Sequence, residues 1–149
     1  MATTSSILFI INPISGVGRQ KLVENVIDKA LDKSKFEVSL GYTNAPKHAI
    51  ELAQEAVETG YDIVAAVGGD GSVNEVASAL VGSKTKMAII PTGSGNGMAR
   101  HLNIPMNLLE AVELVNEQKS IYVDTFSVDK HFCLGTAGFG LDAHIAHKF

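Results

Sequence analysis

The chain has 149 residues, 46% of them apolar, which suits one domain with a substantial core and excludes a disordered tail. Its net charge of −4 and sequence pI of about 5.7 argue against a protein that holds nucleic acid through a general basic field, so we expect no nucleic acid partner. The single cysteine, Cys133, excludes an internal disulfide, and no apolar run approaches the roughly 20 residues that span a bilayer.

Hydrophobic periodicity predicts strands that alternate with helices along the first 120 residues. Short apolar or alternating runs indicate strands, and apolar residues at i, i+3 and i+4 indicate helices. The predicted strands are 6–11, 36–42, 61–67 and 86–90. The predicted helices are 19–32, 45–58 (ended by Gly60), 72–81 and 107–118, with a short helical stretch between Gly97 and Pro105. The apolar stripe expected on the first helix is Leu22, Val26, Ile27, Ala30 and Leu31.

This alternation predicts an α/β fold, a three-layer sandwich with a mostly parallel sheet over residues 1–120. Ligands of such sheets bind beyond the carboxyl ends of the strands. Three glycine-rich loops, at 12–18, 68–71 and 91–97, follow predicted strands and so belong to that edge. Each loop taken alone has a structural explanation, but three at one edge of a sheet indicate a shared ligand.

The central loop reads Gly-Gly-Asp-Gly at 68–71 and joins a buried strand to an amphipathic helix. Its glycines suit positive φ and close approach of a ligand to the backbone. The helix N-terminus that follows favours an anion such as phosphate. Asp70 is therefore a candidate Mg²⁺ ligand, or a base that accepts a proton from an attacking hydroxyl.

The hydrophobic pattern changes after residue 120. Residues 121–138 predict a β-hairpin with its turn at Asp129 and Lys130, so a second, β-rich domain begins within 121–149. A lone hairpin is marginally stable and exposes strand edges. We therefore expect it to pair with strands outside this chain, as in a fragment, or with a second copy in a homo-oligomer.

Two common nucleotide motifs and a zinc site find no support. The first loop lacks the Gly-x4-Gly-Lys-Ser/Thr pattern of P-loop NTPases, and the third has the wrong spacing for a dinucleotide fingerprint. His144 and His147 lie at i, i+3, but no third zinc ligand is evident. Phosphate binding by these loops would therefore follow neither of these two motifs.

The combined motifs resemble the catalytic domain of the diacylglycerol kinase and sphingosine kinase superfamily. The matching motifs are Asn-Pro-Ile-Ser-Gly at 12–16, Gly-Gly-Asp-Gly-Ser-Val-Asn-Glu-Val at 68–76 and Pro-Thr-Gly-Ser-Gly-Asn-Gly-Met-Ala-Arg at 91–100. Thr43 with His48-Ala49 resembles a short family element, and Gly-Phe-Gly-Leu-Asp-Ala at 138–143 resembles the start of the family's second domain. The resemblance covers essentially the whole chain.

This resemblance implies an ATP-dependent kinase that transfers the γ-phosphoryl group to a lipid hydroxyl. Its α/β nucleotide domain would be akin to those of NAD kinases and phosphofructokinases, followed by the first strands of a β-sandwich that holds the lipid. Asp70 would be catalytic and would bind Mg²⁺, and Arg100 would either add positive charge near the phosphates or be a surface arginine. The implied nucleotide-binding residues are Asn12, Ser15, Gly16, Thr43, Gly69, Gly71, Glu75, Thr92, Gly93, Ser94 and Asn96.

The chain departs from the family pattern in two respects. Gly97 stands where diacylglycerol kinases usually carry a second acid, so a metal network would use Asp70 and Asp124, and the loop looks closer to the sphingosine kinase branch. Family catalytic regions also run to roughly twice this length. We therefore expect the chain to bind Mg-ATP weakly and to be inactive alone. Asp142 would lie near the lipid head group or cap a helix.

The expected partners are ATP and a lipid alcohol, with Mg²⁺ as the cofactor. The expected location is the cytoplasm, with transient contact with a membrane surface. Two alternatives stay open, an NAD-kinase-like enzyme, which shares the Gly-Gly-Asp-Gly turn, and a non-catalytic nucleotide-binding module.

Overall fold

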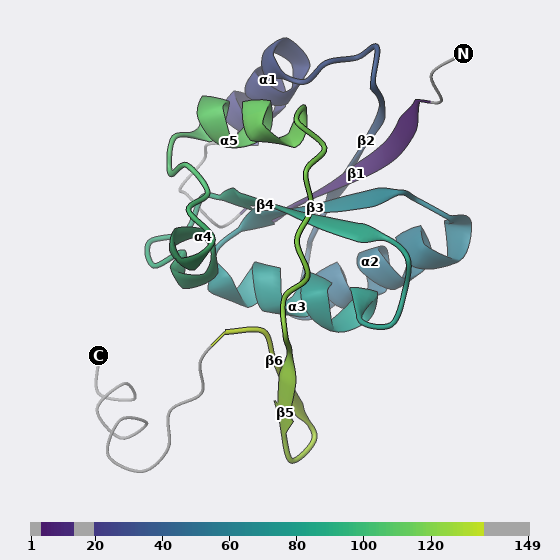
Figure 1. Ribbon diagram of the computed structural model, residues 1–149, viewed down its shortest axis with the longest axis vertical. Coiled ribbons are helices and arrows are strands. Elements are labelled where there is room, and N and C mark those ends of the chain that lie inside the picture. Colours follow the sequence, from purple (N-terminus) through teal and green to yellow (C-terminus); the bar gives the residue numbers. More distant parts are fainter. Residues whose placement is uncertain (1–3, 14–19, 136–149) are drawn as a thin grey trace.

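The computed structural model describes residues 4–13 and 20–135, and a four-stranded sheet forms its centre (Figure 1). Every neighbouring pair of strands is parallel, in the order β2-β1-β3-β4. The strands are β1 Ser5–Ile11, β2 Phe36–Tyr42, β3 Ile63–Gly68 and β4 Lys86–Pro91. The predicted parallel α/β architecture is confirmed, and the strand bounds differ from prediction by at most two residues.

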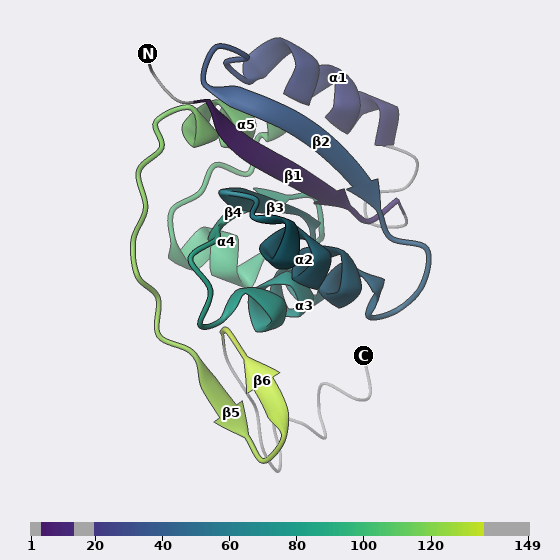
Figure 2. The same ribbon diagram turned by 90° about the vertical axis from the view of Figure 1, so that its right-hand side faces the viewer.

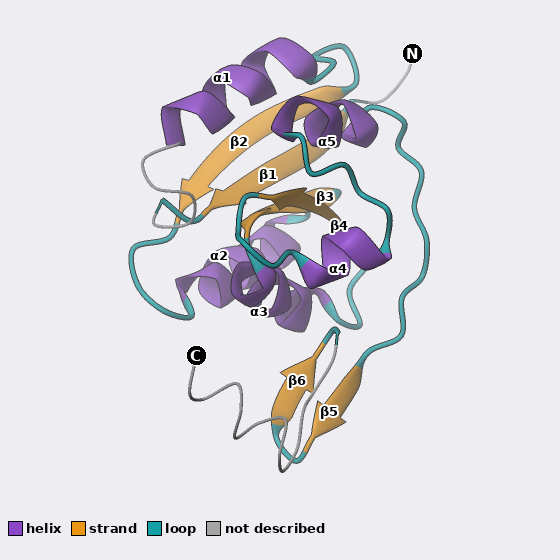
Figure 3. Cartoon of the chain, turned by 90° about the vertical axis from the view of Figure 1, so that its left-hand side faces the viewer, coloured by secondary structure: helices purple, strands orange, loops and turns teal. Residues whose placement is uncertain are grey.

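Helices cover both faces of the sheet and complete three layers, as Figures 1 and 3 show. One face carries α1 Gln20–Ala30 and α5 Leu108–Val115, and the other carries α2 His48–Thr59 and α3 Asp70–Leu80. A short helix, α4 Gly97–His101, follows the loop after β4. Because residues of a strand alternate between its faces, Phe9 packs with α1 and α5 while Ile10 packs with α2 and α3. All of β3 is buried, as expected of a central parallel strand.

The bounds of α2, α3 and α5 differ from prediction for local reasons, and α1 ends at Ala30, two residues before its predicted end. Helix α2 begins at His48 rather than 45, because Lys47 has φ 68° and a left-handed residue cannot continue a right-handed helix. Helix α3 begins at Asp70 rather than 72, because Gly69 O already accepts the first helical bond, from Val73 N at 3.1 Å. Helix α5 is shorter than predicted and begins after Asn107, whose side chain accepts from two backbone N–H groups.

The buried face of α1 is rotated from the predicted stripe. Leu22 is 51% exposed, and Val23 is buried in its place beside Ile27 and Leu31. These three residues are spaced by four, whereas Leu22 falls outside that row. The periodicity was compatible with either row, and packing against the sheet selects the one led by Val23.

The predicted hairpin forms, but it is shorter than 121–138. Strands β5 Phe126–Val128 and β6 His131–Cys133 are antiparallel, with Asp129 and Lys130 in the turn, as predicted. Residues 121–125 are not a strand. Just past β6, Leu134 N donates to the Asn74 side chain of α3 at 3.0 Å. The segment between α5 and β5 runs along the outside of the molecule (Figure 2).

None of the helices in the described part of the chain has the length and apolar character needed to cross a membrane.

Candidate functional site

The candidate site lies where the sheet connections change direction. The chain goes from β1 outward to β2 on one side and then returns to β3 on the other side of β1. Such a switch point opens a crevice beyond the carboxyl ends of the two central strands. Asn12 follows β1 and Gly69 follows β3, so both residues stand at this crevice. The topology therefore brings Asn12 and the second glycine-rich loop together.

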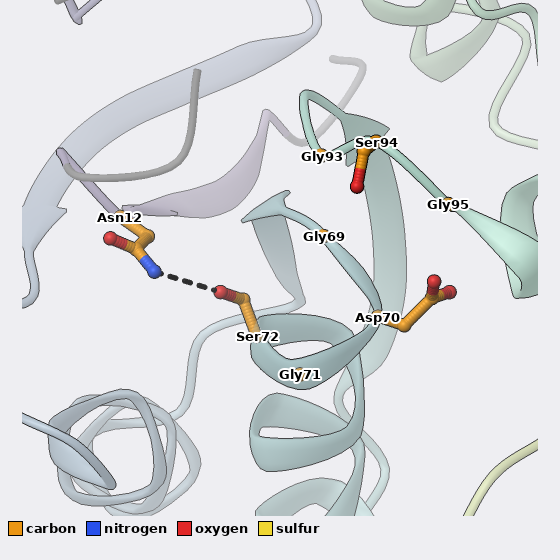
Figure 4. A pocket seen from close by; sticks show the side chains of 8 residues that line it. All are labelled: Asn12, Gly69, Asp70, Gly71, Ser72, Gly93, Ser94 and Gly95. Atoms are coloured by element: carbon orange, nitrogen blue, oxygen red, sulfur yellow. Dashed lines mark hydrogen bonds between the residues drawn. The ribbon is translucent and has the colours of Figure 1, made fainter. Parts of the chain in front are cut away.

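A cleft of about 270 Å³ opens at this point (Figure 4). It is formed by the ends of β1 and β3, the first turn of α3 and the loop after β4. The lining residues are Asn12, Gly69, Asp70, Gly71, Ser72, Gly93, Ser94 and Gly95. Six of them were expected from the sequence, and Ser72 and Gly95 were not. Both missed residues lie within the glycine-rich motifs, so membership of those motifs was the signal that could have found them.

Asp70 is the first residue of α3 and is exposed to solvent. Its Oδ1 accepts a hydrogen bond from Met98 N at 3.3 Å, in the first turn of α4. In Figure 4 the carboxylate points away from Asn12 and Ser72. A Cβ on Gly95 would lie 2.9 Å from Asp70 Oδ2, and one on Gly97 would lie 3.6 Å from Oδ1. The glycines of the third loop therefore leave room for the only carboxylate among the residues that line the cleft.

The glycines of the central loop serve a different purpose from the one predicted. Gly69 has φ −93° and ψ −171°, which is extended backbone, and the described glycines with positive φ are Gly60 and Gly82. The second and third loops pack backbone against backbone, since a Cβ on Gly69 would lie 3.3 Å from Gly93 Cα and one on Gly93 would lie 2.5 Å from Gly69 Cα. A Cβ on Gly71 would meet nothing within 4 Å. The prediction of positive φ was wrong, and at Gly69 and Gly93 the close approach of two loops favours glycine.

Asn96 holds the third loop in shape and is not among the residues that line the cleft, so its role as a nucleotide contact stays a prediction. It is 8% exposed and has φ 52°. Its Oδ1 accepts from Gly93 N at 3.0 Å, and its Nδ2 donates to Gly93 O at 2.7 Å. Arg100 Nε donates to Gly95 O at 2.9 Å from α4. These two side chains fix the turn that presents Ser94 to the cleft.

Asn12 and Ser72 meet across the other side of the cleft. Asn12 Nδ2 donates to Ser72 Oγ at 3.4 Å, which links the end of β1 to the first turn of α3 (Figure 4). The backbone pairing of the strands also continues one residue past β1, since Asn12 N donates to Val67 O at 3.1 Å. The polar groups of both elements are thereby held at fixed positions.

Other predicted site residues stand outside the lining of the cleft. Thr43 and Thr92 extend the sheet pairing past β2 and β4, through bonds of their N–H groups to Ile11 O and Gly68 O. Glu75 Oε1 accepts from Lys47 N at 3.3 Å and so supports the start of α2. Their roles as nucleotide contacts stay predictions.

The remaining predictions concern a second metal ligand and the residues outside the described ranges. Asp124 is exposed, between α5 and β5. Across residues 4–13 and 20–135, no group of three or more His, Cys, Asp or Glu side chains is placed to hold a metal ion. Asp124 therefore stays a predicted ligand. Ser15, Gly16, Asp142, His144 and His147 lie outside the described residues.

A parallel α/β domain with glycine-rich loops at its switch point is typical of proteins that bind phosphorylated ligands. The particular family follows from comparison with known sequences. The diacylglycerol kinase catalytic domain matches residues 6–128, and the chain belongs to this family. The resemblance proposed from the motifs is confirmed.

Relatives and solved structures agree with this assignment. A diacylglycerol kinase of Staphylococcus epidermidis strain RP62A is 28% identical over 144 residues, which cover 93% of this chain and 45% of the relative. The crystal structure of a diacylglycerol kinase from Bacillus anthracis strain Sterne superposes with a TM-score of 0.72 at 26% identity, covering 84% of this chain and 46% of the other. Another solved chain from that strain gives 0.78 at 26% identity, covering 89% and 48%. The chain spans about half the length of the proteins it matches.

Proposed function

We propose that this chain is the nucleotide-binding part of an ATP-dependent lipid kinase that transfers the γ-phosphoryl group of ATP to a lipid hydroxyl. The observation that carries the proposal is the cleft itself, in which Asp70 stands at the N-terminus of α3 beside the glycine loops that follow β3 and β4. Membership of the diacylglycerol kinase catalytic family supports kinase chemistry and a lipid acceptor.

The first turn of α3 offers a binding site for the phosphates. The N–H groups of Asp70, Gly71 and Ser72 precede the first intrahelical bond, from Val73 N to Gly69 O, so they have no acceptor within the helix. The helix dipole adds partial positive charge at the same end. A triphosphate in the cleft would accept these N–H groups, while Ser94 would approach from the opposite loop.

Asp70 would hold Mg²⁺ together with the phosphates. Magnesium commonly takes one or two carboxylates plus phosphate oxygens, so a cleft with one carboxylate fits this ion. Bound there, the ion would neutralise charge on the phosphates. Asp124 is the second ligand that we propose, on sequence grounds alone.

In the proposed transfer, the lipid hydroxyl oxygen forms a bond to the γ-phosphorus and the bond to the β–γ bridging oxygen breaks. ADP leaves with the bond's electron pair, and the hydroxyl proton passes to the Asp70 carboxylate. The protein otherwise positions groups and stabilises charge, as in other phosphoryl transfers. The residues that line the cleft all come from the α/β layers. We propose that the acceptor side of the reaction uses other residues, and that the 149-residue chain binds Mg-ATP without phosphorylating lipid.

The experiment is transfer of γ-labelled phosphate from ATP to diacylglycerols, sphingoid bases, other lipid alcohols and NAD⁺. It uses the 149-residue chain and a chimera in which the C-terminal half of the Staphylococcus epidermidis relative follows Phe149. We expect Mg-ATP binding by both proteins and labelled lipid from the chimera. Labelled NAD⁺ would favour an NAD kinase. A folded chimera that binds ATP and labels no acceptor would favour a non-catalytic module, and turnover by the 149-residue chain would contradict its inactivity.

Asp70→Asn in the chimera tests the assigned base. A general base contributes roughly 10²- to 10⁴-fold, so we expect at least about a hundredfold loss of lipid phosphorylation with the fold intact. Asp129→Asn is the matched control, because Asp129 is also exposed but lies in the β5–β6 turn. Equal activity of the two variants would remove Asp70 from the mechanism.

A further inference from the structure

The β5–β6 hairpin is joined to the α/β layers by the side chain of Asn74. This residue lies on α3, which contacts β6. Its Nδ2 donates to Phe132 O at 3.2 Å, and its Oδ1 accepts from Leu134 N at 3.0 Å. Figures 1 and 2 both place the hairpin beside α3. One amide therefore satisfies two backbone groups of the β6 region at once.

The spacing of these two bonds is that of strand pairing. Backbone groups two residues apart face the same edge of a strand, so the amide of Asn74 pairs with β6 as a residue of a neighbouring strand would. An amide side chain has a donor and an acceptor on separate atoms, whereas an ionised aspartate of the same size only accepts and a serine carries both functions on one oxygen. Asparagine is thus matched to this contact.

An apolar contact stands next to the amide bonds. Leu134 packs against the core cluster on the face of α2 and α3, which includes Val73 and Val76 of the same helix. Asn74 and Leu134 are both half-buried. Partial exclusion of water strengthens the two hydrogen bonds and makes an unpaired amide costly, so the bonds and the packing support each other.

Asp70 and Asn74 are four residues apart on α3, so they lie on one side of the helix about one turn apart. One residue faces the cleft, and the other holds the hairpin. A rigid helical turn therefore sets the distance between the carboxylate and β6.

We propose that Asn74 is a positioning residue that fixes the β5–β6 hairpin relative to Asp70. Its consequence for catalysis rests on the proposed kinase function: loss of Asn74 lowers kcat for lipid phosphorylation and leaves the KM for ATP unchanged, because the glycine loops are untouched.

The direct test is hydrogen exchange at the Leu134 amide in the 149-residue chain. Because Asn74→Ala removes two hydrogen bonds of ordinary net strength, we expect the Leu134 amide to exchange at least about tenfold faster than in the unchanged protein. Ser78→Ala is the matched control, because Ser78 lies one turn further along α3 and bonds within the helix to Glu75 O. Asn74→Asp keeps the acceptor for Leu134 N and loses the donor to Phe132 O, so we expect intermediate exchange.

Alkylation of Cys133 gives an independent readout, because this thiol is half-buried between the two bonded residues and is the chain's single cysteine. We expect faster alkylation in Asn74→Ala than in Ser78→Ala. Unchanged exchange and alkylation in a folded Asn74 variant would overturn the proposal. If Asn74→Ala does not fold, exchange and alkylation are compared between Asn74→Asp and Ser78→Ala instead.

The kinetic arm uses the same variants in the chimera. A fall in kcat with constant KM for ATP in Asn74→Ala, partly restored in Asn74→Asp, supports the positioning role. Equal kcat for Asn74→Ala and Ser78→Ala would overturn it. A chimera that labels no acceptor, with Leu134 exchange still dependent on Asn74, would instead count against the kinase function and leave the docking contact in place.

Discussion

Gly69 and Gly93 pack so closely that a Cβ built on Gly93 would lie 2.5 Å from the Cα of Gly69. This contact presses the loop after β3 against the loop after β4. Both loops line the cleft, so its shape depends on two residues without side chains.

Substitution of Gly93 by alanine should therefore destabilise the protein. The obstructing atom is backbone, which cannot rotate away, so we expect a loss of about 1–3 kcal/mol, typical of overpacking. Gly71→Ala is the control, because a Cβ there meets nothing within 4 Å and the residue is helical. The control should be neutral or more stable by up to roughly 1 kcal/mol. Urea denaturation of both variants measures the difference, and equal midpoints would contradict the contact.

Gly97→Asp should create a second carboxylate beside Asp70. A Cβ at this position would lie 3.6 Å from Asp70 Oδ1, which is an ordinary van der Waals contact. Two neighbouring carboxylates repel each other and bind a divalent cation more tightly than one. We expect a lower Tm than in the unchanged protein without metal, and a larger rise of Tm on adding Mg²⁺. Gly97→Asn, of the same size and uncharged, should show neither effect.

Asn96→Ala should open the turn between β4 and α4. The substitution removes both bonds to Gly93 and places alanine at φ 52°, so we expect a loss of about 1–3 kcal/mol. Asn96→Gly separates the two causes, because glycine tolerates this φ but lacks the amide. If the glycine variant is as stable as the unchanged protein, the side-chain bonds contribute nothing.

Asp32 should titrate below its ordinary range. Hydrogen bonds from the Ser34 hydroxyl and then from the Ser34 backbone N–H lower the pKa of Asp32 below 3.8. A carboxyl whose folded pKa is lowered stabilises the fold above its unfolded pKa, and that contribution disappears as the pH falls through the folded value. NMR titration should show the Asp32 midpoint moving up towards 3.8 in Ser34→Ala. An unchanged midpoint would show that the hydroxyl has no part in the shift.

The strands were predictable because a buried parallel strand is apolar almost throughout. In β3, Ile63 and Val64 begin a run that is buried on both faces, and no helical stripe fits it. The helix starts were less predictable, since they depend on single residues. The left-handed Lys47 and the extended Gly69 set the starts of α2 and α3, and neither backbone conformation could be predicted from the sequence.

The family, the parallel α/β layers and the loops at the cleft could be predicted from the sequence alone, because glycine spacing and hydrophobic period are local properties. The partners of the polar side chains became known only from the folded chain. Asn96 accepts from Gly93 N, Glu75 accepts from Lys47 N before α2, and Asn74 accepts from Leu134 N beside the hairpin. The reason is that the structural role of a polar side chain depends on its hydrogen-bond partner, and these partners lie in segments that come together only on folding.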